Sequence, residues 1–170
     1  MAERHIVIEK ERLNYEGLFN AKELFEIIKS WAADKGYWVV EKIHAESLKP
    51  EGKYIELVLD PVFKKLTDYA KSVIKIRIQM SEVKDVTVEI DKRKTKLQEG
   101  KIKIVFDGIL ETDYEHRWEM KPLFYVIRTL WEKYIYTPFI SGFEKDIKRD
   151  LMKLKDDIKS YLNLAKFRIK

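Results

Sequence analysis

The chain has 170 residues, 45% of them hydrophobic, and a formal net charge of +5 at pH 7. This length and apolar content are typical of one globular domain that buries its own core, and the lack of cysteine excludes a disulfide framework and a thiolate metal site. Charged residues make up 37% of the chain, and the abundance of lysine and glutamate is typical of hyperthermophile proteins.

The N-terminus, MAERHIVIEK, predicts a protein that stays in the cytoplasm. It lacks the apolar region of a signal peptide, and no apolar run approaches the roughly 20 residues of a membrane span. We therefore expect a single cytoplasmic domain over residues 1–170 that has no membrane partner.

The first third of the chain predicts a strand, a helix and a hairpin. HIVIEKERLNY has the pattern of a strand, and FNAKELFEIIKSWAADKG has that of a helix, which Asn20 caps and Gly36 ends. The apolar residues of this helix fall on one face: Leu24, Ile27, Ile28 and Trp31. YWVVEKIHAESL and KYIELVLD alternate with period two around the turn KPEG, which predicts a hairpin.

The middle of the chain predicts three more antiparallel strands. SVIKIRIQM, DVTVEID and GKIKIVFDGIL each alternate apolar with polar residues, so each has one buried and one solvated face. Together with the first strand and the hairpin, they give about six strands. The apolar face of this meander needs a cover, for which the first helix and a helical region starting near Lys121 are the candidates.

The last third predicts a long, broken helix. PLFYVIRTLWEKYIY is apolar on several sides, as expected for a helix buried under a sheet. Pro138 and Gly142 interrupt the pattern, so we expect a kink or break before the helix resumes at Phe143. The expected fold is α+β, an antiparallel meander packed against an N-terminal helix and a broken C-terminal helix.

Residues 143–170 predict an amphipathic helix that ends in a basic tail. Its narrow apolar stripe advances in steps of four and three, as the d and a positions of a heptad do: Ile147, Leu151, Leu154, Ile158 and Tyr161. Such a seam predicts dimerisation, and a second copy is the simplest partner because two-fold homodimers are the commonest oligomers. The alternative is a peripheral helix that lies along its own domain.

Basic residues near the last hairpin and at the C-terminus predict contacts with RNA phosphates. The candidates are Lys92, Arg93, Lys94, Lys96 and Lys101 in a loop, and Lys166, Phe167, Arg168 and Lys170 in the tail. Phe167 would fill an apolar slot or stack on a base. The alternatives are a solvated lysine surface and a frayed chain end.

The sequence offers little catalytic chemistry. Glu111, Asp113 and His116 form the densest group of functional side chains, but their spacing matches no known set of metal ligands, and a site would require all three to converge. Nucleotide-binding glycine motifs, zinc-protease motifs and nucleophile elbows are absent from the sequence. We expect no enzyme, no cofactor and no metal site.

Four parts of the chain resemble a small archaeal family: HIVIEKERLNYEGLFNAKELF, KGYWVVEK, IVFDGILETDYEHRWEMKP and the helical tail. This is the archaeal ribosome dimerisation factor family, which acts in hibernation. The resemblance implies a non-enzymatic homodimer that binds the small (30S) ribosomal subunit, through rRNA and ribosomal proteins, joins two subunits and inhibits translation. It implies no DNA partner, and it carries over no functional residue.

The order of the elements also resembles the helix-grip layout of START-like and Bet v 1-like domains. This likeness implies the alternative function, a carrier that holds a small hydrophobic ligand between the sheet and the C-terminal helix. A carrier needs an empty apolar cavity of hundreds of cubic ångströms, whereas a ribosome factor is expected to have a filled core.

Overall fold

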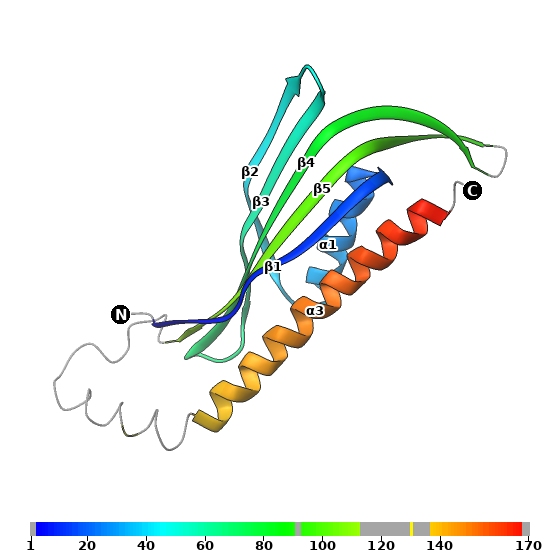
Figure 1. Cartoon of the computed structure of the whole chain (residues 1–170). Coiled ribbons are helices and arrows are strands. Elements are labelled where there is room, and N and C mark those ends of the chain that lie inside the picture. Colours follow the sequence, from blue (N-terminus) through cyan, green and yellow to red (C-terminus); the bar gives the residue numbers. More distant parts are fainter. Residues whose placement is uncertain (1–2, 91–92, 113–129, 131–136, 168–170) are drawn as a thin grey trace.

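The described part of the chain forms one antiparallel sheet and two helices (Figure 1). A computed structural model describes residues 3–90, 93–112, 130 and 137–167. The strands are β1 (Glu3–Phe19), β2 (Trp38–Lys49), β3 (Gly52–Lys65), β4 (Ala70–Ile90) and β5 (Arg93–Thr112), and the helices are α1 (Ala21–Lys35) and α3 (Thr137–Phe167). The expected α+β class, with an antiparallel sheet packed on two helices, is confirmed.

The first strand lies beside the last one. The strand order is β1-β5-β4-β3-β2, so β1 and β2 are the two edges of the sheet. The sheet curves over both helices, which lie on its concave side (Figure 1). Within the described residues no helix covers the convex side.

The sheet has five strands where the sequence predicts about six. SVIKIRIQM and DVTVEID are not separate strands, because both belong to β4 and both pair with β5. The polar residues between them form a bulge, with a register shift between Ser81 and Lys84 and a positive φ of 56° at Glu82. A bulge inserts a residue and bends the strand without ending it, and so it escapes a pattern search that expects a turn.

Helix α1 agrees with the prediction at both ends. The side chain of Asn20 accepts hydrogen bonds from the backbone N–H groups of Lys22 (3.0 Å) and Glu23 (3.3 Å). Gly36 ends the helix in the left-handed conformation, with φ 74°. Leu24, Ile28 and Trp31 are buried and Ile27 is partly buried, so the expected apolar face packs on the core.

Helix α3 is continuous from Thr137 to Phe167, so the predicted interruption at Gly142 is wrong, while Pro138 lies at the start of the helix. Pro138 is the second residue of the helix, where a missing N–H costs no hydrogen bond. Gly142 lies within the helix, and a glycine there lowers helix stability by about 1 kcal/mol without interrupting it. The predicted helical stretch at residues 122–136 lies outside the described residues, except for Leu130.

The heptad-like stripe of α3 belongs to the core of its own domain. Ile147, Leu151, Leu154 and Ile158 are at most 1% exposed, and three of them share one cluster with residues of the sheet and α1. Gly108 of β5 lets the helix approach, since a Cβ there would lie 3.2 Å from the Cγ2 atom of Ile147. The assignment of these side chains to an intermolecular seam is therefore wrong, because they are already buried within one chain.

Tyr161, the last residue of the stripe, binds the start of α1. Its hydroxyl accepts from the backbone N–H of Asn20 (3.2 Å) and lies 3.0 Å from Oε2 of Glu23, to which it donates. It is partly buried in the same core. Dimerisation through some other surface stays a prediction.

A buried polar network joins α1, β4 and α3 at the opposite end of α1. The hydroxyl of Tyr37 lies 3.0 Å from Oγ of Ser72 and donates to Oδ2 of Asp150 (3.4 Å), and Asp150 also binds Nζ of Lys35 (3.0 Å). Burial raises the pKa of Tyr37 to about 12. The network therefore holds the tyrosine in its neutral form.

We expect the domain to lose stability in alkaline solution. Between pH 10, the ordinary pKa of tyrosine, and pH 12, Tyr37 ionises in the unfolded chain but stays protonated in the folded one. Its contribution is complete below pH 10 and falls by roughly 1 kcal/mol per pH unit as the pH rises from 10 towards 12. Burial also raises the pKa of Tyr161, which acts in the same direction. Urea unfolding measured from pH 8 to pH 12 should show this fall, with a smaller slope for Tyr37→Phe; an equal slope in the variant would contradict it.

Candidate functional site

Three basic side chains and the carboxylate of Asp107 surround Val105 on the convex face of the sheet. Val105 of β5 pairs with Arg12 of β1 on one side and with Arg77 of β4 on the other. Lys103 precedes it by two residues on the same face of β5. Directly paired side chains have Cβ atoms about 5 Å apart and diagonal ones about 7–8 Å. We call Arg12, Arg77 and Lys103 the outer cationic cluster.

The outer cationic cluster lacks acidic partners within the described part of the chain. All three residues are exposed, and none forms a salt bridge with a described residue. Other lysines of the same face are paired: Lys75 lies 3.6 Å from Asp60, and Lys101 lies 2.7 Å from Glu82. Neighbouring like charges on a sheet are destabilising, so the cluster favours binding of an anion such as a phosphate group.

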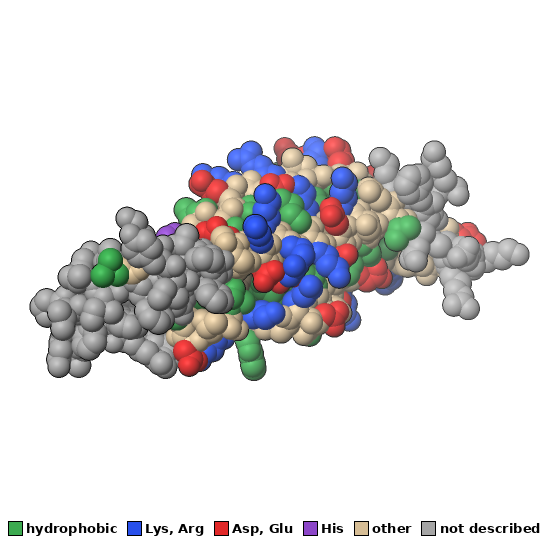
Figure 2. Space-filling view, turned by 90° about the horizontal axis from the view of Figure 1, so that it is seen from below, with side chains coloured by type: hydrophobic (Ala, Val, Ile, Leu, Met, Phe, Trp, Pro, Cys, Tyr) green, Lys and Arg blue, Asp and Glu red, His purple; other side chains and the backbone are tan. Residues whose placement is uncertain are grey.

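The helical side of the molecule has a different charge pattern. On the face seen in Figure 2, Lys and Arg side chains are interspersed with Asp and Glu side chains. On α3, Arg149 is paired with Asp146 at 2.6 Å, and Lys155 is paired with Glu11 of β1. Charges of both signs are thus mixed on this side, but several lysines of α3, such as Lys145, Lys153 and Lys159, also form no salt bridge with any described residue.

Of the basic residues predicted to form a loop, those that the structure describes lie on a strand instead. Arg93 pairs with Ile90 at the start of β5, and Lys94, Lys96 and Lys101 follow along the same strand. Lys94 and Lys96 are exposed. The hydrogen bond with Glu82 raises the pKa of Lys101 and keeps it engaged within the chain.

Most of the predicted tail lies outside the described residues. Lys166 and Phe167 belong to the last turn of α3, but their side chains lie outside the described part of the structure, as do Lys92, Arg168 and Lys170. The predicted set of binding residues does not include Arg12, Arg77 or Lys103. The alternation of β1, β4 and β5 marks each of them as solvent-facing, but only the sheet order brings them together.

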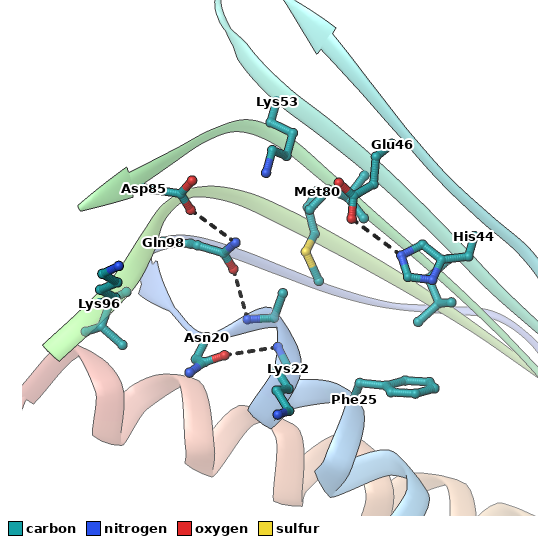
Figure 3. A pocket seen from close by; sticks show the side chains of 14 residues that line it. Asn20, Lys22, Phe25, His44, Glu46, Lys53, Met80, Asp85, Lys96 and Gln98 are labelled. Carbon is teal, nitrogen blue, oxygen red and sulfur yellow. Dashed lines mark hydrogen bonds and ion pairs between the residues drawn. The ribbon is translucent and has the colours of Figure 1, made fainter. Parts of the chain in front are cut away.

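A pocket of about 430 Å³ lies between the start of α1, the β2–β3 hairpin, the second half of β4 and the first residues of β5 (Figure 3). We call it the α1 pocket. Its apolar wall consists of Phe25, Ile55, Leu57, Met80 and Leu97. Charged and polar side chains line the rest: Asn20, Lys22, His44, Glu46, Lys53, Asp85, Lys96 and Gln98.

The acidic side chains of the α1 pocket already have partners. The side-chain amide of Gln98 donates to Asp85 (3.4 Å), and its carbonyl oxygen accepts from the backbone N–H of Ala21 (3.1 Å). Glu46 lies 3.6 Å from Nε2 of His44. The three lysines of the pocket form no ion pair with any described residue, so its uncompensated charge is positive.

The residues considered for catalysis are not brought together by any described contact. Glu111 is buried between Lys71 (2.9 Å) and Arg4 (3.4 Å). Burial raises the pKa of Glu111, but the two cations outweigh it, so the pKa is lowered overall. Asp113 and His116 lie outside the described residues, and among those that are described no group of three or more His, Cys, Asp or Glu side chains is placed to hold a metal.

The structure and the comparisons with known proteins leave the family open. Neither helix is apolar enough over a sufficient length to cross a membrane, within the residues that the structure describes. No protein-family model matches the chain, and no curated protein matches it. Two features of the described residues suggest a binding function: the outer cationic cluster and the α1 pocket.

Proposed function

We propose that the chain is a non-enzymatic cytoplasmic protein that binds the small ribosomal subunit. As a homodimer it holds two subunits together during hibernation and so inhibits translation. The observation that carries the proposal is the outer cationic cluster, in which three exposed cations that form no salt bridge with a described residue lie on the convex face of the sheet. The resemblance to the archaeal ribosome dimerisation factors suggests the partner, and the positive charges of the cluster are suited to binding the phosphate groups of rRNA.

The geometry of the cluster favours the RNA backbone over the bases. Arg12 and Arg77 present guanidinium groups, which bind phosphate oxygens in a bidentate manner, and Lys103 adds a point charge. Contacts with phosphates position a protein but read no sequence. A curved sheet with basic side chains therefore suits recognition of folded rRNA by shape and charge.

The filled core agrees better with a ribosome factor than with a carrier of the helix-grip type. We propose that the sheet curved along α3 is a helix-grip arrangement. Leu151, Leu154 and Ile158 are fully buried between α3 and the sheet, together with Ile76 and Phe106. These side chains occupy the place where a helix-grip carrier would hold its ligand.

With the α3 stripe buried, the proposed dimer needs another surface. A row of apolar residues crosses the convex face from edge to edge, following the register of all five strands: Trp38, Phe63, Val73, Ile109 and Ile6. Trp38 is 71% exposed and Ile6 is 65% exposed at the two edges of the sheet, whereas Val73 in the middle of the row is 7% exposed. We assign this row to the second copy, because a two-fold axis sets the same apolar row on both partners.

Trp38→Lys should then produce a monomer by light scattering without loss of the fold.

Sedimentation tests the proposal directly. Purified protein is mixed with small ribosomal subunits at low salt and separated on a sucrose gradient. We expect it to migrate with the subunits and to shift part of them to a faster-sedimenting dimer, with binding that weakens steeply as salt rises. Protein that stays at the top of the gradient at low salt would contradict the proposal.

A carrier of a small hydrophobic ligand is the second candidate function. The α1 pocket favours it, because about 430 Å³ falls within the range of about 300–1,000 Å³ typical of small-ligand sites. This pocket lies beside α1, and not between the sheet and α3 as in the expected carrier. Native mass spectrometry of the purified protein tests this candidate, since a bound carrier ligand adds a defined mass that the denatured chain lacks.

A further inference from the structure

We propose that the α1 pocket binds an amphipathic anion, a small molecule with an apolar body and one carboxylate. This inference rests on the second candidate function and is independent of ribosome binding. It specifies which class of ligand the pocket selects.

The apolar wall of the α1 pocket sets the body of the ligand. Ile55 and Leu57 come from β3, Met80 from β4, Leu97 from β5 and Phe25 from α1, so four elements contribute to the wall. In Figure 3 the side chain of Met80 extends from the sheet into the space above α1. A flexible methionine among branched side chains adapts to apolar ligands of different shapes. A medium-length alkyl chain or an aromatic ring system fits this wall.

Lysine side chains set the charge of the ligand. Lys53 is half-buried, and in Figure 3 its side chain points from the β2–β3 hairpin into the pocket. Lys22 and Lys96, both exposed, also line the pocket. A cationic ligand would be repelled by these lysines, and a neutral one would leave the ammonium of Lys53 without a counter-charge, so a carboxylate is the complementary group.

The start of helix α1 adds no free donor to the pocket. The backbone N–H of Ala21 donates to Gln98, those of Lys22 and Glu23 donate to Asn20, and that of Leu24 donates to the backbone oxygen of Asn20. An anion in this pocket must therefore be bound by side-chain ammonium groups. This makes Lys53 the residue that decides selectivity.

Displacement of a fluorescent probe tests the inference on the full chain. The anionic probe 8-anilinonaphthalene-1-sulfonate is bound first and then displaced with decanoate, decanol or decyltrimethylammonium, which share one alkyl length. We expect decanoate to bind about tenfold more tightly than decanol, and the ammonium compound to bind most weakly. Lys53→Met, which keeps the length of the side chain, should remove the preference for decanoate while leaving decanol affinity unchanged. Lys53→Arg should keep the preference.

Lys159→Met on the exposed side of α3 is the matched control, because it removes the same charge far from the pocket in sequence and on another element. It should leave the preference intact. Equal affinities for decanoate and decanol in the unchanged protein would overturn the anion inference and leave the carrier function standing. No displacement by any of the three compounds would overturn both.

Discussion

Replacing Leu154 by aspartate should unfold the domain and not merely split a dimer. Leu154 is 0% exposed and lies in the main core cluster. A carboxylate there has no partner, and burying it unpaired costs several kcal/mol, a large part of the about 5–15 kcal/mol that stabilises a typical domain. We expect Leu154→Asp to lose most of its far-ultraviolet circular dichroism signal at 25 °C. Leu154→Ala should stay folded but lose about 2–5 kcal/mol in urea unfolding.

Lys153→Asp is the control for this experiment, since it introduces the same carboxylate one residue away on the exposed side of α3. It should change the free energy of unfolding by about 0.5 kcal/mol or less. If the unchanged protein is a dimer and Leu154→Asp is a well-folded monomer, this result would support the intermolecular seam that the sequence pattern predicts.

Reversing the charges of the outer cationic cluster should abolish binding to the small ribosomal subunit. The triple variant Arg12→Glu, Arg77→Glu and Lys103→Glu alters only exposed side chains, so its circular dichroism and thermal unfolding should stay close to those of the parent. Each charge-assisted contact contributes about 1 kcal/mol or more, so three lost contacts reduce the affinity by about 100-fold or more. Co-sedimentation at several salt concentrations measures this loss of affinity.

A milder triple change to glutamine should lower the slope of log affinity against log salt by about three.

Lysines on α3 provide a control of equal charge. Lys145, Lys153 and Lys159 are exposed and form no salt bridge with any described residue, so changing all three to glutamate alters the net charge by the same amount. If both triple variants lose binding equally, net charge and not the cluster is responsible.

The basic tail is the competing anchor. A chain that ends at Asn163 retains the buried part of the α3 stripe and lacks Lys166, Phe167, Arg168 and Lys170. The sequence predicts that this shortened chain stays folded but fails to bind the subunit, whereas the outer cationic cluster predicts that it still binds. Loss of binding in the shortened chain, with retained binding in the cluster variant, would identify the tail as the anchor.

Local features of the chain were predictable because short-range interactions decide them. Asn20 caps α1 through backbone groups two and three residues away, and Gly36 ends the helix because it adopts a positive φ without steric cost. The period of two in the strands likewise reports which face is buried. The bulge in β4 also leaves a trace, since the apolar spacing changes from two to three between Met80 and Val83, both buried.

The role of the α3 stripe depended on the tertiary structure. Spacing of four and three residues presents one apolar face, and that face packs equally well on a partner helix or on the concave side of a sheet. Gly108, far away in sequence, makes room for Ile147 and Leu151, which allows α3 to lie close to β5. A periodicity within one helix carries no information about such a distant partner.

By itself, the sequence determined the α+β class, the limits of α1, the β2–β3 hairpin and the buried faces of most strands. The tertiary structure alone decided which faces meet. Arg12 lies about ninety residues from Lys103 in the chain, and the two become neighbours only because β1 pairs with β5. The α1 pocket likewise joins the start of α1 to strands that follow much later. Sites built from distant elements depend on strand order, and strand order is decided by the packing of the whole core and not by local pattern.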